Sequence, residues 1–363
     1  WDANANNQTT QEADNLCEGT FGVTVTDING CQDFTTVSLS QPPELLGTTN
    51  VTSNYNGEDV SCFGADDGSA NVSPTGGTPD YYYQWDANAA NQTTQEATNL
   101  EAGIYNVTVT DENGCTIERN VELTEPTQLI ADIEVTSDYN GQDVTCNGAT
   151  DGSAMVTPSE GTAPYFYQWD ANAGNQTTAE ATGLGAGTYN VTISDNNGCE
   201  IVRQIVLTEP QPVIASATVT SDYNGQDISC FGFSDGSAIV NPSQGTSPYT
   251  YQWDANASNQ TTQEATSLSV GSYTVTVYDA NSCSVETTIN LTQPTQLDAY
   301  TQVMSDYNGQ DISCNGENDG VAQVFPSNGT PGYTYSWTSG STFATATGLS
   351  ATTYTVTVYD ANS

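Results

Sequence analysis

The sequence contains no lysine and no histidine, and its only basic side chains are Arg119 and Arg203. Against these two arginines stand 44 acidic side chains, which give a net charge of −42 at pH 7. Nucleic acids and anionic membranes need basic patches, so this charge excludes both as electrostatic partners. Without histidine or lysine, the commonest general bases, the Schiff-base amine and the amine of isopeptide cross-links are all missing. We therefore expect no enzyme.

Long hydrophobic runs are missing too, because no stretch approaches the ~20 apolar residues that span a bilayer. We therefore expect no membrane insertion in this segment. The chain starts at Trp1 inside one sequence repeat and stops at Ser363 inside another. It is expected to be part of a longer protein, in which a cysteine follows Ser363 and the export signals and anchors lie elsewhere.

The repeats are marked by tryptophans at an 84-residue spacing: Trp1, Trp85, Trp169, Trp253 and Trp337. A period of 20–50 residues would indicate a solenoid, whereas 84 residues suffice for a small domain with its own core. The sequence therefore predicts a tandem array of like domains. The predicted domains are a partial repeat at 1–41, complete repeats at 42–125, 126–209 and 210–293, and a partial repeat at 294–363.

Within one repeat, apolar and polar residues alternate in short runs separated by Gly, Pro and Asn. This pattern is typical of strands joined by tight turns. In the repeat 126–209 we predict seven strands, at 130–135, 144–146, 153–157, 165–169, 177–182, 189–194 and 201–207. The fold class is therefore all-β, with each repeat an immunoglobulin-like Greek-key β-sandwich.

Two aromatic positions of each repeat are predicted to form its core. Trp85, Trp169, Trp253 and Trp337 occupy the place of the core tryptophan of immunoglobulin-like sandwiches. A second motif, Leu-x-x-x-x-Tyr, predicts a tyrosine corner at Tyr105, Tyr189, Tyr273 and Tyr354, where the hydroxyl bonds back to the backbone. Phe21 replaces this tyrosine in the first repeat and cannot make the bond. The links between repeats are short and contain proline, which favours stiff, extended connections.

The combined motifs resemble a known family. Asp143 to Gly148, Asp151 to Ala154, Pro164 to Trp169, Leu184 to Tyr189 and Asp195 to Cys199 are similar to the SprB repeat of giant surface adhesins of gliding Bacteroidetes. The resemblance covers all five copies, three of them complete. It implies secretion by the type IX route and display as filaments outside a Gram-negative cell, with a role in adhesion and gliding motility.

Eight of the nine cysteines form two periodic series, which in small extracellular domains indicates disulfides. Cys17 belongs to neither series. Pairing within a repeat joins Cys62–Cys115, Cys146–Cys199 and Cys230–Cys283, and this is the pairing that we favour. Pairing across the links joins Cys31–Cys62, Cys115–Cys146, Cys199–Cys230 and Cys283–Cys314. A third connectivity joins Cys62 to Cys199 and Cys146 to Cys283.

Recurring loop aspartates are candidate calcium ligands, because Ca²⁺ prefers several oxygen ligands supplied by loops. The candidates are Asp59, Asp111, Asp143, Asp195, Asp227 and Asp279. None lies in an EF-hand spacing, and Asp also serves in tight turns, which is the alternative explanation. Calcium is the one cofactor that the sequence suggests.

The leading functional hypothesis is a stalk or filament segment of a secreted surface adhesin. Its expected partners are the neighbouring repeats, lateral copies in a filament, and a surface or polysaccharide ligand bound by parts outside this segment. The alternatives are a multivalent array that binds carbohydrate or ions, with Tyr55, Tyr139, Tyr223 and Tyr307 as sugar-stacking candidates, and a spacer in a large secreted polysaccharide-degrading enzyme.

Overall fold

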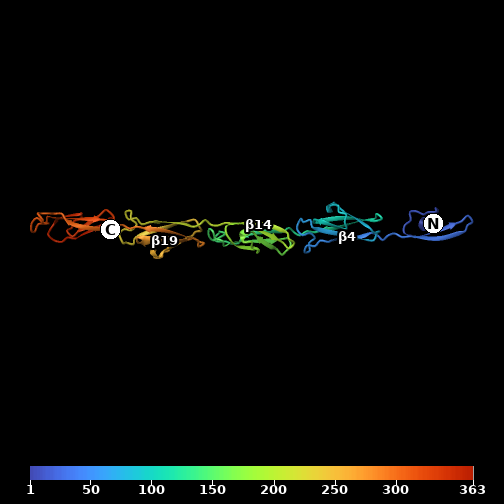
Figure 1. The fold of residues 1–363 in the computed structure, drawn as a ribbon, viewed down its shortest axis with the longest axis horizontal. Coiled ribbons are helices and arrows are strands. Elements are labelled where there is room, and N and C mark those ends of the chain that lie inside the picture. The colour runs from blue at the N-terminus through green and yellow to red at the C-terminus, as the bar shows by residue number, and fades with distance from the viewer. Residues whose placement is uncertain (363) are drawn as a thin grey trace. The chain divides into compact units, whose positions relative to one another are not determined.

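The computed structural model describes residues 1–362, and its regular elements are short antiparallel strands with a few single-turn 3₁₀ helices (Figure 1). The all-β prediction is confirmed, because strands of four to nine residues recur in every repeat.

The elements follow the same order in each complete repeat. Repeat 42–125 contains β3 (Leu46–Val51), β4 (Gly68–Thr75), β5 (Tyr81–Trp85), η2 (Ala87–Ala89), β6 (Glu96–Leu100), β7 (Gly103–Asp111) and β8 (Thr116–Leu123). Repeat 126–209 contains β9 (Ile130–Val135), β10 (Gly152–Ser159), β11 (Phe166–Trp169), η3 (Ala171–Ala173), β12 (Glu180–Leu184), β13 (Gly187–Ser194) and β14 (Glu200–Leu207). Repeat 210–293 contains β15 (Ile214–Val219), β16 (Gly236–Ser243), β17 (Thr250–Trp253), η4 (Ala255–Ala257), β18 (Glu264–Leu268), β19 (Gly271–Tyr278) and β20 (Ser284–Leu291).

The partial repeats contain parts of the same set. The first has η1 (Ala3–Ala5), β1 (Gly19–Thr26) and β2 (Gln32–Leu39). The fifth has β21 (Asp298–Val303), β22 (Gly320–Ser327), β23 (Thr334–Trp337), β24 (Thr345–Leu349) and β25 (Val356–Tyr359).

Each complete repeat forms two three-stranded antiparallel sheets, ordered β3-β4-β6 and β5-β7-β8 in the repeat 42–125. A complete repeat therefore has six strands, and the seventh predicted strand, at 144–146, is wrong. Those residues lie in a loop whose backbone bonds to a side chain, since Thr145 N–H donates to Asp151 Oδ1 at 3.1 Å. A loop amide that is satisfied by a neighbouring carboxylate has no need of a sheet partner.

The core of each complete repeat is built around its tryptophan, as predicted. Trp85, Trp169 and Trp253 are fully buried. The indole N–H of Trp85 donates to Thr94 O at 2.9 Å, which satisfies its single polar group in the apolar interior. Trp337 in the fifth repeat is buried and makes the equivalent bond, to Phe343 O.

The tyrosine corner is also present. Tyr105, Tyr189 and Tyr273 donate from their hydroxyls to backbone oxygens four residues earlier, at 2.8, 3.0 and 2.7 Å. Tyr354 is half-buried and differs, because its hydroxyl accepts from Ser350 N–H at 3.1 Å. Phe21 is buried at the matching place in the first repeat.

A 3₁₀ helix capped by an aspartate follows each of the first four tryptophans, whereas a turn without such a helix follows Trp337. Asp86 precedes η2, and its Oδ1 accepts from Ala89 N–H at 3.3 Å. Its Oδ2 accepts from the backbone and side-chain amides of Asn106, at 2.9 and 3.0 Å. This aspartate therefore ties the helix to the neighbouring strand β7 and explains why the motif Trp-Asp-Ala-Asn recurs.

Candidate functional site

Successive repeats meet where the loop after the first strand of one repeat contacts the last hairpin of the next. In the first contact the loop is 53–67 and the hairpin is 195–199. In the second they are 137–151 and 279–283, and in the third they are 221–235 and 360–362. We call each of these contacts a junction, and the junctions are the sites that recur along the chain.

A disulfide crosses each of the first two junctions. Cys62 is bonded to Cys199 and Cys146 to Cys283, and the Cα atoms are 5.6 Å apart in both pairs. The favoured within-repeat pairs are therefore wrong. These wrong pairs are Cys62–Cys115, Cys146–Cys199 and Cys230–Cys283. The connectivity that forms is the third one considered, from one repeat to the next.

Strand β8 shows why a within-repeat bond does not form in the repeat 42–125. Cys115 directly precedes the first residue of β8. Beyond the other end of β8, Thr124 N–H donates to Asp59 Oδ2 at 2.8 Å, three residues from Cys62. Eight strand residues span ~25 Å, whereas bonded cysteines need Cα atoms within ~7 Å. The two cysteines therefore lie at opposite ends of their repeat.

The remaining cysteines of residues 1–362 are unbonded. They are Cys17, Cys31, Cys115, Cys230 and Cys314. Cys115 is exposed at a hairpin tip, and Cys230 is half-buried in the loop of the third junction. The alternative pairs across the links are not formed either, because their members are bonded elsewhere or free.

One asparagine side chain locks each junction. The Nδ2 group of Asn197 donates to Tyr55 O of the preceding repeat and to Thr162 Oγ1 of its own repeat, both at 3.2 Å. Its Oδ1 accepts from Asn56 Nδ2 at 2.5 Å. The side-chain amide of Asn197 therefore both donates and accepts hydrogen bonds across the junction.

The same arrangement recurs at the other two junctions. Asn281 donates to Tyr139 O at 3.1 Å and to Thr145 O at 3.2 Å. Asn362 donates to Tyr223 O and Ser229 O, both at 3.1 Å. Sequence reasoning missed these residues, because an asparagine in a hairpin tip predicts a turn and does not reveal a contact with another repeat.

The links between repeats are held against the same loops. Pro126, Pro210 and Pro294 are buried, whereas Pro42 after the partial first repeat is exposed. In the loop, Gly64 N–H donates to Glu125 Oε2 at 2.7 Å, and Gly148 N–H donates to Glu209 Oε2 at 2.6 Å. The three links at Pro126, Pro210 and Pro294 are therefore packed against these loops.

Three of the predicted calcium ligands, Asp59, Asp143 and Asp227, form a first set, whose members bind the first residue after the last strand of their repeat. The Oδ2 atoms of Asp59, Asp143 and Asp227 each accept two hydrogen bonds, from the backbone amide and the hydroxyl of a threonine. The threonines are Thr124, Thr208 and Thr292, and the distances lie between 2.6 and 2.8 Å. These aspartates join the loop to the end of the last strand of the same repeat.

The second set holds the last hairpin. Asp111, Asp195 and Asp279 are buried, and each accepts backbone amides from the hairpin and from the loop before the tryptophan strand. For Asp111 the donors are Cys115 N–H at 2.8 Å and Thr78 N–H at 2.9 Å. The amide of Thr78 is the main reason that the pKa of Asp111 lies below its ordinary value of 3.8.

The two sets do not come together as a metal centre. Among residues 1–362 there is no group of three or more Asp, Glu, Cys or His side chains placed to hold one ion. The carboxylates predicted for calcium are instead occupied by backbone amides and threonine hydroxyls. The turn chemistry that competed with calcium in the sequence accounts for them.

The turn-tip tyrosines have a local role. The hydroxyls of Tyr55, Tyr139 and Tyr223 donate to Asp67 O, Asp151 O and Asp235 O, each at 3.0 Å. Tyr307 makes the same bond to Asp319 O at 3.3 Å. These hydrogen bonds hold the tyrosines to their own loops, so the local packing that competes with sugar stacking at turn tips is the arrangement observed.

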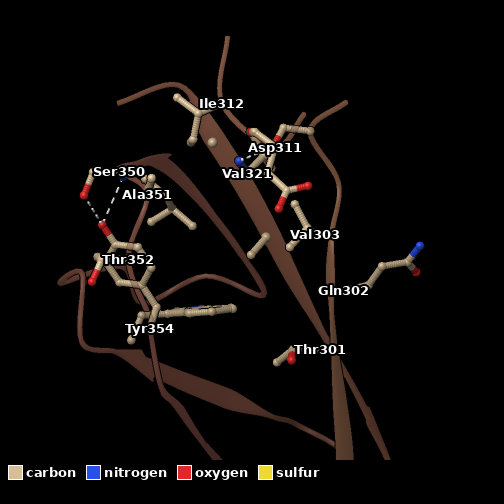
Figure 2. A pocket seen from close by; sticks show the side chains of 15 residues that line it. Thr301, Gln302, Val303, Asp311, Ile312, Val321, Ser350, Ala351, Thr352 and Tyr354 are labelled. Atoms are coloured by element: carbon tan, nitrogen blue, oxygen red, sulfur yellow. Dashed lines mark hydrogen bonds between the residues drawn. The ribbon is translucent and has the colours of Figure 1, made fainter. Parts of the chain in front are cut away.

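A cavity of about 440 Å³ in the fifth repeat reflects packing (Figure 2). Val303, Ile312 and Val321 line it together with Trp337 and Tyr354. In the repeat 42–125 this space is filled, because a Cβ placed on Gly68 would meet Leu123 Cδ2 at 2.5 Å. At the equivalent Gly320 the near atoms belong to Ile312 and Leu349 only. The cavity therefore lies where Leu123, Leu207 and Leu291 pack in the complete repeats.

Comparison with known families identifies the repeats. A family profile described as the SprB repeat matches residues 54–90, 139–174, 223–258 and 307–342. Each match runs from the junction loop to the segment after the tryptophan. The chain therefore carries four SprB repeats, which confirms the resemblance for four of the five copies that the motifs predicted; the profile does not match the partial copy at residues 1–41. A search of curated proteins finds no similar sequence.

Three solved structures illustrate what the chain is similar to. A 1.5-MDa bacterial ice-binding adhesin shares 12% identity over 70% of this chain and 98% of that chain, with a TM-score of 0.36. Invasin, a bacterial integrin-binding protein, shares 13% identity over 81% and 71%, with a TM-score of 0.29. The eight N-terminal Ig domains of Down Syndrome Cell Adhesion Molecule share 9% identity over 88% and 56%, with a TM-score of 0.24. The chain thus spans little more than half of that last structure.

Among the described residues, no helix is long and apolar enough to cross a membrane. Disulfides that join SprB repeats are typical of an extracellular protein, because the cytosol keeps thiols reduced. The described chain is therefore a segment of SprB repeats with disulfides of the kind found in extracellular proteins.

Proposed function

Because the chain carries four SprB repeats, we propose that it is an extracellular stalk segment of a long bacterial surface adhesin, with its repeats coupled in series by disulfides. The stalk holds an adhesive part at a distance from the cell and contributes no catalysis. The resemblance to gliding adhesins extends the proposal to a Gram-negative surface, type IX secretion and a role in gliding motility.

The overlap of the two disulfides along the chain is the observation that supports this function most strongly. Between Cys62 and Cys283 lie 221 residues (283 minus 62), which reach about 750 Å when fully extended. The disulfides shorten this covalent path, which runs from Cys62 across to Cys199, back along the chain to Cys146, and across to Cys283. Only 53 residues remain on it (199 minus 146), or about 180 Å.

A pulling force therefore bypasses the parts of the chain that lie outside the path set by the disulfides. The links around Pro126 and Pro210, and the strands β9 and β14, lie outside the segment from Cys146 to Cys199. Peeling these strands or straightening these links cannot lengthen the array beyond the path set by the disulfides. The array keeps a bounded length under load, which is the property that a stalk requires.

The junctions add resistance to bending. The buried Pro126 and the hydrogen bonds of Asn197 hold the link and the hairpin against one loop. Reorienting two repeats would break these hydrogen bonds, and the disulfide limits how far the loop and the hairpin can separate. Strong self-repulsion at a net charge of −42 favours a single thread over a bundle of copies.

The surface suits an environment that contains proteases. Trypsin-like enzymes cut after basic residues, and this chain has only Arg119 and Arg203. Both arginines lie on paired strands, and their Nε–H groups donate to Gly47 O and Ala131 O at 2.7 Å. Cleavage at either site would first require local unfolding.

Single-molecule pulling on the oxidised chain tests the proposal. We expect the segment from Cys62 to Cys283 to extend to about 180 Å when oxidised and to about 750 Å after reduction. In the oxidised Cys62→Ser variant, 84 residues (146 minus 62) replace the first disulfide, so the path rises to at least about 290 Å.

Cys115→Ser is the matched control, since Cys115 is an exposed free thiol in the same repeat. This variant is expected to extend like the wild type. Equal extension of the oxidised and reduced chains would contradict the stalk mechanism.

A further inference from the structure

The outer face of the sheet that contains the tryptophan strand carries one exposed aromatic ring in each of four repeats. The ring always belongs to the same cross-strand pair. The four pairs are Tyr82–Thr110, Phe166–Ser194, Thr250–Tyr278 and Thr334–Tyr359.

The ring changes strand along the chain but keeps its place in the register. Tyr82 and Phe166 lie on the tryptophan strands β5 and β11, whereas Tyr278 and Tyr359 lie on the partner strands β19 and β25. When only the equivalent positions of the tryptophan strands are compared, the aromatic residue of Tyr82 and Phe166 is replaced by threonine at Thr250 and Thr334. The pairing shows that the neighbouring strand supplies it instead, so each repeat has one ring at this pair.

These rings are open to solvent. Their exposed fractions are 59% for Tyr82, 54% for Phe166, 38% for Tyr278 and 45% for Tyr359. An aromatic ring directly opposite a small hydroxyl residue stabilises a sheet by about 0.2–1 kcal/mol, which explains why the two residues face each other across the strands. It does not explain why a large apolar face is left uncovered in every repeat. Since Phe166 has no hydroxyl, the common feature is the ring itself.

Polar groups flank the ring on the same face. The next pair on this face, two positions along the strands, is Gln84–Thr108, Gln168–Thr192, Gln252–Thr276 or Ser336–Thr357. In the repeat 42–125 this pair borders a shallow depression of about 450 Å³, which Asp86, Asn106 and Glu118 also line. An aromatic platform beside amides, hydroxyls and carboxylates is a surface that combines apolar contact with hydrogen-bonding groups.

The charge of the chain restricts what such a face can bind. With 44 acidic and two basic side chains, it repels anionic polysaccharides, nucleic acids and a second copy of itself. We propose that this face binds neutral polysaccharide, with one pyranose ring stacked on the aromatic ring of each repeat. The C–H face of a pyranose carries slight positive charge and meets the negative face of the aromatic ring. The amide N–H groups of Gln84, Gln168 and Gln252 already donate to backbone oxygens of their own repeats, so the sugar hydroxyls meet the hydroxyls and the amide oxygens beside the ring.

This surface lies on strands that the disulfides and the asparagine contacts do not use, so the inference is independent of the stalk mechanism. A chain can fail to bind sugar and still be inextensible, and the two experiments therefore fail separately.

Affinity electrophoresis of the whole chain tests the inference, with native gels that contain hydroxyethyl cellulose, laminarin or a soluble galactan, and with alginate as the anionic comparison. The wild type is expected to be retarded in at least one neutral gel and not in alginate. The combined variant Tyr82→Ala, Phe166→Ala, Tyr278→Ala and Tyr359→Ala is expected to lose all retardation. The matched control Thr110→Ala with Ser194→Ala, on the other side of the same pairs, is expected to keep it.

A strand-exchange variant tests whether binding requires an aromatic ring at this pair or requires it on one particular strand. Tyr82→Thr with Thr110→Tyr, together with Phe166→Ser and Ser194→Phe, moves two rings to the partner strands, as in the later repeats. It is expected to be retarded like the wild type, and its folding is checked by circular dichroism, so the inference does not depend on the alanine variant.

Three results overturn the inference. They are an absence of retardation in all three neutral gels, equal retardation of the combined alanine variant, and equal retardation in alginate. Self-association that the alanine substitutions abolish, without retardation in any gel, would identify a second copy as the occupant instead.

Discussion

Cys62 and Cys199 are 137 residues apart in the chain, yet their sulfurs are bonded and their Cα atoms lie 5.6 Å apart. One belongs to the repeat 42–125 and the other to the repeat 126–209. The bond therefore makes each repeat a member of a covalent series, in which the loop of one domain and the hairpin of the next act as a unit. The first predictions concern the groups that build this unit.

Removal of the Cys62–Cys199 bond is expected to destabilise the repeats that it joins. Cys199→Ser opens a loop of 137 residues, whose closure constrains the unfolded chain by about 3–5 kcal/mol. Denaturant unfolding of the oxidised protein measures the loss. Cys115→Ser is the control, because this exposed thiol has no partner. Equal losses in the two variants would show that the bond contributes nothing.

Asn197→Ala is expected to loosen the first junction by about 1–3 kcal/mol, because it leaves Tyr55 O and Asn56 without their partner. Amide hydrogen exchange in residues 53–62 should rise, while the core around Trp85 stays protected. Asn113→Ala is the control, since Asn113 occupies the same hairpin position in the repeat 42–125 and donates to Thr78 Oγ1 of its own repeat. Unchanged exchange in residues 53–62 would refute the locking role of Asn197.

Removal of the hydroxyl oxygen from a tyrosine corner is expected to lower the stability of its repeat. Tyr189→Phe removes the hydroxyl that donates to Gly185 O at 3.0 Å, at an expected cost of about 0.5–1.5 kcal/mol. Tyr82→Phe is the control, because the hydroxyl of this exposed residue contacts only the exposed Glu112. Thermal unfolding of both variants provides the comparison, and a Tyr189→Phe protein as stable as the control would argue against the corner.

Acid is expected to loosen the last hairpin of the repeat 42–125. The amide of Thr78 is the main cause that lowers the pKa of Asp111 below 3.8 in the folded protein. A carboxylate with a lowered pKa stabilises the fold above the unfolded value, and this contribution is lost as the pH falls through the folded value. Stability should therefore be constant near pH 5 and should decline below about pH 3.8.

Asp111→Asn should be less stable than the wild type at pH 5, and the difference between the two proteins should shrink in acid. Asp132→Asn, at an exposed aspartate, is the control. Thermal melts between about pH 2.5 and 6 measure this dependence, and a difference that stays constant with pH would contradict it.

Local sequence patterns predicted most of the fold. Alternation with period two located the strands around Trp169 and Tyr189 within a few residues, because strand faces are encoded by near neighbours. The error at 144–146 has a local cause as well. The backbone N–H of Thr145 donates to the carboxylate of Asp151 and not to a neighbouring strand. The alternation of apolar and polar residues does not distinguish these two kinds of partner.

The contacts between repeats were less predictable from the sequence than the strands were. The periodic cysteines indicated disulfides, but their spacing allowed three connectivities, and the within-repeat pairing that we favoured is not the one that forms. Asp59 and Asp111 had the oxygen chemistry of calcium ligands and also that of backbone caps, and only their partners separate the two. The aromatic pair on the outer face was hidden because the ring moves from one strand to its neighbour, which only the register reveals.

The sequence by itself determined the charge, the 84-residue period, the strands and the tryptophan and tyrosine positions of the core. Each of these depends on composition or on residues close together in the chain. The tertiary structure decided that Cys62 bonds to Cys199 and not to Cys115, and that the aspartates hold backbone amides. The physical reason is distance: a disulfide or a carboxylate contact forms only between groups that the folded strands bring to the same end of a repeat, and the ~25 Å length of β8 keeps Cys62 and Cys115 apart.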